Sequence, residues 1–527
     1  MKKIKFSLLF LAMAALTFQS CVNDLDVEPL DDDTFLSEKF FASSPDSYKQ
    51  GLAGIYGNLT LTGANGSGSS PLQGIDAGTS QFGRCLLYLQ DLTTDEMIWS
   101  YEQDAGTREL QRNVWTSENP ILLGMFSRIM LEIAYVNEYL RMTTPERLSA
   151  RGVTDAAMIA EIETYRNEVR TLRAYSYYVM MDLFGKAPMV TENDPINFRG
   201  PEADRAELFT FVESELNAVM PALKDAGSND YGRLDKAFAQ MVLAKIYLNA
   251  EVYIGANRYS DCLSQCNAII GSGAFSLEDD YLDNFNADNH TSSEMIFTLQ
   301  SDGIRTQNYG ATTTIINGEV GSVESNGAQL GVTPGWGGAL RLRRQMVEKF
   351  NGSDFDFDER KQIISGDRPI DITNVSNQGQ GFITTKYKNI TSAGVVGSNQ
   401  VFVDTDFPLF RLADVYLMAT EASLRGGGAF DGLTYVNNLR LRAGAGTITA
   451  GELNLPFIID ERLRELYWES HRRQDLIRFG RYTGGAYNWA WKGNAQSGVA
   501  IPATFAVFPL PAQSIASNPN LTQNTGY

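Results

Sequence analysis

The order of apolar and polar positions predicts a mainly helical chain. Apolar residues recur at helical spacing over the segments 46–56, 120–144, 155–184, 203–224, 234–251 and 258–271. Small and large residues alternate on one face of 234–251. After a short turn, 258–271 offers a matching apolar face, as in a tetratricopeptide-type hairpin. A less regular hairpin follows at 409–443. Because the two hairpins are far apart in the sequence, we expect one superhelix assembled from distant segments.

Residues 275–405 lose this helical periodicity. Gly, Asn, Ser and Thr dominate there, and the pieces 294–299 and 381–388 favour strands. We predict a second, irregular lobe of short strands and long loops, which is where ligand contacts tend to gather. Residues 62–82 are similarly rich in Gly, Ser and Thr and predict a long loop, which in a folded body is usually functional or disordered.

The segment 460–482 carries the densest charge pattern, and we predict one helix ended by Gly480. Its apolar stripe consists of Leu463, Leu466, Tyr467, Ser470 and Ile477. The pairs expected along its surface are Asp460/Arg464, Arg462/Glu465 and Glu469/Arg473. Since Trp468 and His471 interleave with the charges, we predict a sandwiched packing helix that buries its paired charges.

Composition and charge restrict the possible partners. The chain of 527 residues is 43% apolar and 20% charged, an ordinary globular composition with room for two lobes or one large helical body. Its formal charge of −19 becomes −22 once the first twenty residues, with three lysines, are removed. Such a chain repels nucleic acid and anionic lipid surfaces, and suits neutral ligands or cations.

The N-terminus has the pattern of a targeting segment. Three lysines precede an apolar run at 6–18 that is too short to span a bilayer comfortably. Ser20 and Cys21 then resemble a bacterial lipobox, with Phe18 as a departure. This implies a signal peptide at 1–20, acylation of Cys21, a tether at 21–45 and anchoring in the outer membrane. Acidic residues just after Cys21 resemble a surface-export signal. The alternative is a plain secretory peptide with Cys21 as a spare thiol.

The supply of metal ligands is small. Cys85, Cys262 and Cys266 are too few for a disulfide framework. With only two histidines in the chain, a zinc site is close to excluded. The acidic turn 279–283 is a candidate calcium site, and no other cofactor is predicted.

Four further motifs carry a resemblance to a known family. They are RAYSYYVMMDLFGKAPMV at 173–190, FRLADVYLMATEA at 410–422, NLRLRA at 438–443 and the ending at 509–527. Together with 460–482, where Ser470 replaces a usual glycine, they resemble the SusD/RagB family of outer-membrane glycan-binding lipoproteins. The resemblance implies helical parts at 46–274 and 406–527 around the 275–405 lobe. It also implies delivery of a glycan to a TonB-dependent transporter of the SusC type.

The candidate ligand residues follow from what a sugar requires, namely aromatic rings that stack on its C–H face and polar groups for its hydroxyls. Within the ligand segment 62–115 they are Asp76, Arg84, Trp99, Tyr101 and Asp104. Tyr309 and the glycine-flanked Trp336 complete the set. The spacing of Asp76, Arg84 and Trp99 resembles the starch-binding member of the family and implies an α-glucan. Asp104 stands where an asparagine would be expected.

Two other classes of function were weighed. A glycoside hydrolase needs two carboxylates on either side of the scissile bond, and neighbours such as Asp95/Glu96 or Asp279/Asp280 cannot face a substrate from opposite sides. No nucleotide-binding or nucleophile-elbow motif occurs in the required context. The sequence therefore predicts a non-catalytic glycan binder. The alternatives are a tetratricopeptide-like protein scaffold without sugar binding and, less favoured, a hydrolase.

Overall fold

The computed structural model describes residues 37–72 and 74–527, so the proposed signal peptide and Cys21 lie outside the described residues. The chain divides into a short unit that ends at Tyr48 and a large unit from Lys49 to Tyr527. In the short unit, α2 (Ser37–Ser43) is followed by Ser47, whose hydroxyl donates to the carbonyl of Phe41 at 3.2 Å. The site and the fold described below belong to the large unit.

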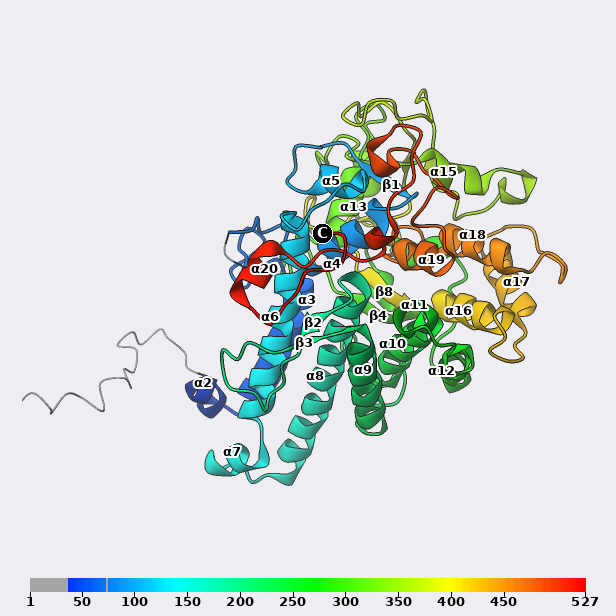
Figure 1. Ribbon diagram of the computed structural model, residues 1–527. Helices are drawn as coiled ribbons and strands as arrows, with labels where there is room; N and C mark the ends of the chain where they lie inside the picture. The colour runs from blue at the N-terminus through cyan, green and yellow to red at the C-terminus, as the bar shows by residue number, and fades with distance from the viewer. Residues whose placement is uncertain (1–36, 73) are drawn as a thin grey trace, which may run out of the picture. The chain divides into compact units, whose positions relative to one another are not determined.

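The long helices form the main body, as predicted (Figure 1). They are α3 (Ser47–Thr60), α6 (Pro120–Met142), α8 (Ala156–Leu183), α9 (Arg205–Val219), α10 (Lys236–Leu248), α12 (Tyr259–Ser272), α16 (Leu412–Leu424), α17 (Gly432–Arg442), α18 (Leu455–Leu466) and α19 (Arg472–Arg478). Side-chain caps start several of them, as at Asn119 before α6 and Asp155 before α8. Asp204 and Glu207 form a complete capping box at α9.

These helices pack in an order that crosses the sequence. The α10–α12 hairpin packs next to α16, although some 140 residues separate α12 from α16. α16 then packs against both α17 and α18. One tetratricopeptide-like superhelix is therefore built from distant segments, which confirms the prediction.

Shorter helices fill the connections. They are α4 (Phe82–Leu87), the π-helix η1 (Tyr88–Leu92), α5 (Thr107–Gln111), α7 (Pro145–Ala150), α11 (Ala250–Ile254), α13 (Ala311–Glu319), α14 (Gly327–Leu330), α15 (Arg344–Val347) and α20 (Ala512–Ser517). The periodicity did not predict α13, whose sequence ATTTIINGE is rich in β-branched residues. All of its residues are buried, so tertiary packing outweighs local propensity here.

The strands form four two-stranded antiparallel ribbons, and the irregular lobe with short strands is as expected. The pairs are β1 (Met97–Trp99) with β5 (Leu340–Leu342), β2 (Ala187–Pro188) with β3 (Glu202–Ala203), β4 (Met295–Leu299) with β8 (Phe407–Arg411), and β6 (Ile363–Ile364) with β7 (Ile383–Thr384). Because β4 pairs with β8, the residues between them leave and rejoin the helical body at one place.

The predicted single helix over 460–482 is wrong. α18 ends at Leu466, and α19 starts at Arg472. Between them Trp468 and Ser470 take left-handed backbone conformations, with φ of 61° and 62°. Two buried carboxylates fix this break, since the N–H of Trp468 donates to Glu96 and that of Ser470 to Asp91, at 3.1 and 2.8 Å. Gly480 follows α19 with φ of 65°, as the predicted C-terminal glycine.

The ion pairs expected along that helix are also wrong. The residues pair with other elements instead: Asp460 with Lys349, Arg462 with Asp414 and Asp475, and Glu469 with Arg411 and Lys386. Burial explains the pairs of Arg462 and Glu469, whose side chains find partners across the packing interface. Arg464 still pairs within its own helix, with Glu461 at 2.7 Å. The prediction that paired charges are buried is confirmed.

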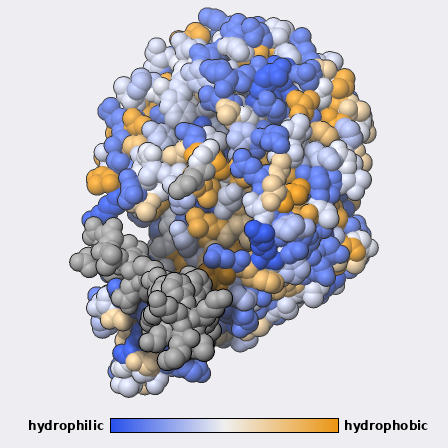
Figure 2. Space-filling view, turned by 60° about the vertical axis from the view of Figure 1, so that its left-hand side comes forward, coloured by the Kyte–Doolittle hydropathy of each residue, from blue (hydrophilic) through white to orange (hydrophobic). Residues whose placement is uncertain are grey.

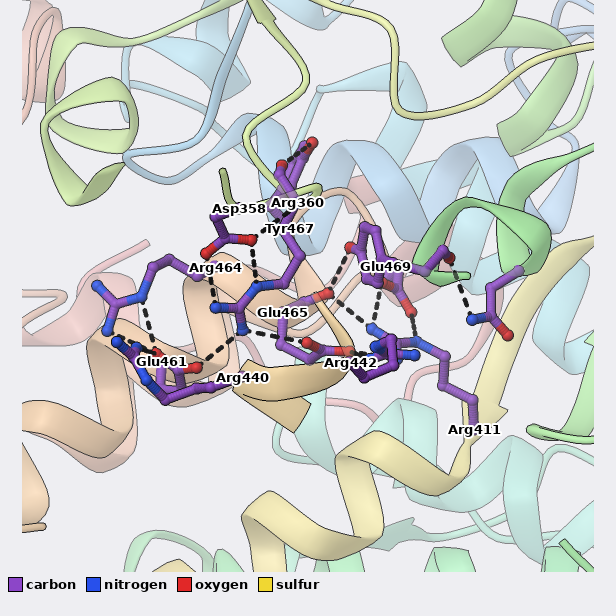
Figure 3. A network of polar contacts seen from close by, with 12 residues as sticks. Asp358, Arg360, Arg411, Arg440, Arg442, Glu461, Arg464, Glu465, Tyr467 and Glu469 are labelled. Carbon is purple, nitrogen blue, oxygen red and sulfur yellow. Dashed lines mark hydrogen bonds and ion pairs between the residues drawn. The ribbon is translucent and has the colours of Figure 1, made fainter. Parts of the chain in front are cut away.

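Figure 3 shows this buried ionic network. Its cations are Arg360, Lys386, Arg411, Arg440, Arg442 and Arg464, and its carboxylates are Glu294, Asp358, Glu461, Glu465 and Glu469. Glu465 alone accepts from Arg360, Arg411 and Arg442, at 3.2, 2.8 and 2.6 Å. Burial by itself would raise the pKa of Glu465, but these arginines outweigh it and lower the pKa to about 2. The network joins segment 358–386 to β8, α17 and α18.

Candidate functional site

All seven residues predicted to contact a ligand line one cavity of about 460 Å³. They are Asp76, Arg84, Trp99, Tyr101, Asp104, Tyr309 and Trp336. The wall is completed by Ser67, Gly68, Ala77 and Gly78. Residues more than 250 positions apart in the sequence therefore meet at one place. Because of this separation in the sequence, no single motif contains the site.

Local structure holds each segment in position. Gln81 caps α4, and its side chain accepts from the N–H of Arg84 at 2.8 Å. This cap fixes the start of α4 and thereby the position of Arg84. Trp99 is the last residue of β1, opposite Leu340 on β5. The N–H of Tyr309 donates to the hydroxyl of Thr62 at 2.9 Å, which brings the 62–81 loop to the lobe.

Trp336 stands on a glycine-dependent turn. Gly335 and Gly337 on either side have φ of 67° and 61°, where side chains are disfavoured. A Cβ on Gly335 would lie only 2.4 Å from the side chain of Val320. The N–H of Trp336 donates to the carbonyl of Asn317 at 2.8 Å, and its own carbonyl accepts from the Tyr101 hydroxyl at 2.8 Å. The turn is thus fixed on both sides.

The aromatic rings form one edge-to-face cluster. The ring of Trp99 lies 5.9 Å from Tyr88, 6.0 Å from Tyr101 and 5.9 Å from Trp336, with interplanar angles of 60°, 72° and 83°. Trp99 is only 2% exposed, so it lines the cavity as a covered wall and presents no open face. A ring face for stacking is offered instead by the half-buried Trp336, with Tyr101 and Tyr309 beside it.

Polar groups surround these rings. Asp104 Oδ2 accepts from the Trp99 indole N–H at 2.9 Å, and Asp76 Oδ1 accepts from the N–H and hydroxyl of Thr79 at 2.9 and 3.0 Å. Among the residues that the structure describes, nothing bonds to the second oxygen of either carboxylate. Each carboxylate therefore keeps one acceptor for a ligand hydroxyl.

Arg84 is the cation of the site. Its Nε donates to the Tyr88 hydroxyl at 3.0 Å, and its guanidinium lies 5.3 to 5.9 Å from the ring centres of Tyr88, Trp99 and Trp336. Burial would lower the pKa of Arg84, but Tyr88, Asp104 and Asp76 outweigh it and raise the pKa, so the group stays charged. Its terminal nitrogens have no bond to any side chain or carbonyl in 37–72 or 74–527, and can donate to a ligand.

Two residues that shape the cavity, Tyr88 and Gly78, were not predicted from the sequence. Tyr88 lies four residues after Arg84 on continuous helix, a spacing that could have indicated the pair. Gly78 lies where a Cβ would be 3.0 Å from Arg84 Nη1 and 3.5 Å from Asp76 Oδ1, so a side chain there would push into the cavity. Only the folded chain shows that contact.

The structure does not bring a metal site together. In the described part of the chain, no three His, Cys, Asp or Glu side chains are grouped so as to hold a metal ion. In the acidic turn 279–283, Asp280 caps the N–H of Leu282, and Asp283 accepts from the side chain of Asn286.

A second concave region has a different character. A groove of about 780 Å³ runs between α6, the 188–200 segment and α20, with Leu131, Tyr135, Ile196 and Phe198 among its walls. Figure 2 shows hydrophobic residues gathered in a hollow on this side of the molecule. α6 is long and apolar enough to cross a membrane by composition, but 61% of that stretch is buried as in a core helix. Polar side chains such as Asn197 and Gln513 also line this groove. The aromatic cavity is the candidate site because it gathers clustered rings around Arg84 and the two carboxylates with free oxygens.

Comparison with known proteins relates the chain to one family. The family model described as the SusD family matches residues 371–527. The chain is 32% identical to the starch-binding protein SusD of Bacteroides thetaiotaomicron, with 99% of this chain and 98% of that protein aligned. It is 28% identical to the SusD-like protein P25 of Formosa agariphila, over 68% of this chain and 72% of the relative.

Solved structures share the fold. Surface glycan-binding protein A from Bacteroides thetaiotaomicron, in complex with laminarihexaose, superposes with a TM-score of 0.68 at 20% identity, covering 91% of this chain and 99% of that one. A SusD superfamily protein of the same organism gives a TM-score of 0.70 at 17% identity, covering 91% and 99%. At these identities the likeness concerns the fold alone.

Proposed function

Because this chain belongs to the SusD family, we propose that it is a non-catalytic glycan-binding protein of the cell surface. The observation that carries the proposal is the convergence of Trp336, Tyr101 and Tyr309 with Arg84 and two half-free carboxylates on one cavity. Rings supply stacking surface for the C–H face of a sugar, and the polar groups supply donors and acceptors for its hydroxyls. The named relatives bind starch and laminarihexaose, which are both neutral glucans.

The preferred ligand in this proposal is an α-glucan. The support is the 32% identity to a starch-binding protein over nearly the whole chain, together with the spacing of Asp76, Arg84 and Trp99. Asp104, in place of the expected asparagine, changes one hydrogen-bonding group of the cavity from a donor and acceptor to an acceptor only.

The proposal includes an anchor and a partner. Acylation of Cys21 would hold the protein on the outer membrane, and a SusC-like TonB-dependent transporter would receive the captured oligosaccharide. A Cys21→Ala variant is expected to leave the membrane fraction, and affinity purification of the wild-type protein is expected to recover the transporter. Recovery of Cys21→Ala in the membrane fraction, or of no transporter, would remove that part of the proposal.

Calorimetric titration of the full-length protein against neutral and acidic glycans tests the central claim. Trp336→Ala is expected to abolish most of the binding. The matched control is Phe357→Ala, which removes an aromatic ring that is 86% exposed and does not line the cavity. Binding that survives Trp336→Ala would place the site elsewhere. No binding to any glycan would favour the scaffold alternative, and appearance of hydrolysis products would favour the enzyme.

A further inference from the structure

The two tryptophans of the cavity belong to one small ribbon. Trp99 ends β1 and pairs with Leu340 on β5, while Trp336 lies four residues before Leu340 on the turn that leads into β5. The N–H of Ser100 donates to the carbonyl of Ala339 at 2.8 Å and extends the pairing toward the cavity. The distance and angle between the two indoles therefore depend on how this three-residue ribbon is held.

Arg343, just after β5, holds the ribbon from one side. Its side chain is fully buried, and within the described part of the chain its guanidinium donates only to backbone carbonyls. These are Met97 on β1 at 2.8 Å, Gln111 at the end of α5 at 2.8 Å, Leu92 at the end of η1 at 3.5 Å, and Ala490 in the C-terminal tail. The side chain of Gln111 in turn accepts from the N–H of Trp99 at 2.7 Å. One side chain thus joins four segments directly behind Trp99.

Arg341, the central residue of β5, joins the ribbon to a further segment. Its fully buried guanidinium donates to the carbonyls of Asn377 and Gln380 at 2.6 and 2.9 Å, and to that of Val375. Val375 also packs on Ile98, the β1 partner of Arg341. The 375–380 turn continues to Gln378, whose amide donates to the Ser100 hydroxyl at 3.4 Å, next to the Trp336 turn.

Both arginines differ from the buried arginines of the ionic network. Arg360 and Arg411 are neutralised by carboxylates, whereas no carboxylate within the described ranges forms an ion pair with Arg341 or Arg343. Burial lowers the pKa of each to about 9. A buried charge without a counter-charge is costly, and a packed apolar residue would fill the space at lower cost. A rigid fork with five N–H donors, however, is the one side chain that can bond several carbonyls at once.

We infer that Arg341 and Arg343 are the positioning residues of the binding cavity: through backbone carbonyls they set the edge-to-face geometry of Trp99 and Trp336. This inference rests on the proposed function only for its effect on affinity. The ring geometry itself is a property of the ligand-free protein. Neither arginine lines the cavity.

The test compares Arg343→Lys with Arg440→Lys in the full-length protein. Lysine keeps the charge but replaces the planar fork by a compact ammonium. Arg440 is a matched control, because it is equally buried, bonds a backbone carbonyl and Glu461, and lies far along the chain from both tryptophans. The ring geometry is read as the part of the near-ultraviolet circular dichroism that a Trp336→Phe variant removes, and binding is measured with the glycan that the wild type prefers.

Arg343→Lys is expected to lose that spectral component and to bind about tenfold more weakly at a temperature where it is fully folded. Arg440→Lys is expected to unfold at a lower temperature with both readouts unchanged. If Arg343→Lys keeps the component and the affinity, its role is stability alone and the inference is wrong. Should that variant fail to fold, Arg341→Lys decides by the same readouts. A wild type that binds no glycan would overturn the proposed function, while the spectral comparison would still decide the positioning role.

Discussion

The buried ionic network and the aromatic cavity both place arginines among aromatic rings, but they leave the guanidinium in opposite states. Arg411 in the network has three carboxylate partners, and all of its surroundings are covered. Arg84 in the cavity has one neutral hydroxyl partner and open terminal nitrogens. A cation whose donors are all bonded stabilises the fold and has no donor left for a ligand, whereas one with free donors in a cavity is available for binding.

The comparison also separates recognition of the family from recognition of the site. The residues that make 460–482 and 410–422 so recognisable, such as Glu465 and Arg411, are buried in the network and touch no cavity wall. The residues that line the cavity lie at turns, at the end of β1 and, for Arg84, on the short helix α4, and they share no sequence pattern. Motifs that identify a fold mark its most constrained packing, which need not be where it binds.

The largest effect is expected from Glu465→Gln. Removing this charge leaves three buried arginines short of a partner, so the free energy of unfolding should fall by about 3–5 kcal/mol. Denaturant titration measures it. Glu348→Gln is the control, since its pair with Arg344 is solvent-exposed and should contribute less than about 1 kcal/mol. A change at Glu465 as small as that of the control would show that the network is not a stabilising unit.

Trp336→Ala should have the opposite effect to Glu465→Gln, with a large loss of affinity and a small change in stability. Loss of this ring is expected to weaken glycan binding by about 2 kcal/mol, roughly 30-fold, as for a central aromatic contact. Because the ring is half-buried and its turn is held by backbone bonds, the unfolding midpoint should change little. Equal losses of stability and affinity would mean that the cavity and the fold cannot be separated.

The break between α18 and α19 should make the stability of the protein sensitive to pH. Asp91 bonds the break at Ser470, and burial raises its pKa to about 8 against the opposing hydrogen bonds from the N–H groups of Ser470 and Arg472. The folded protein then holds a proton that the unfolded chain has lost above its ordinary pKa of about 3.9, so stability should fall as pH rises from about 4 to 8.

Asp91→Asn tests this because its amide imitates the protonated acid and cannot ionise. We expect its unfolding free energy to depend less on pH than that of the wild type, with a gain of about 3–4 kcal/mol at pH 8 relative to pH 5. Unfolding curves at several pH values provide the measurement. Identical pH slopes for the two proteins would show that Asp91 is ionised in the folded state.

The smallest effect is expected from Asp104→Asn. The amide oxygen can still accept from the Trp99 indole, so ring geometry and stability should stay the same. The new N–H group should change affinity for a neutral glycan by no more than about 1 kcal/mol, or fivefold, with a gain if the ligand presents an acceptor there. A loss as large as that of Trp336→Ala would mean that the carboxylate charge itself binds the ligand.

Several features were decided by the sequence itself. Helical periodicity located the long helices, because the residues on the buried face of a helix recur every three to four positions in the sequence. The separated hairpins at 234–271 and 409–443 indicated a superhelix built from distant segments. Residue type located the site candidates, because a sugar requires aromatic rings for stacking and polar groups for its hydroxyls, and both occur together in the glycine-rich loops. All seven candidates do line one cavity, although their part in binding is still a proposal.

Other features were decided only by the tertiary structure. The break at Trp468 and Ser470 could not be read from the helical pattern, because the carboxylates that stabilise it, Glu96 and Asp91, lie some 370 residues away. The covered face of Trp99 depends on Tyr88 and Trp336 meeting it from other elements. The partners of Arg343 are backbone carbonyls, which every residue carries and no sequence pattern distinguishes. Long-range contacts of that kind exist only once the chain has folded.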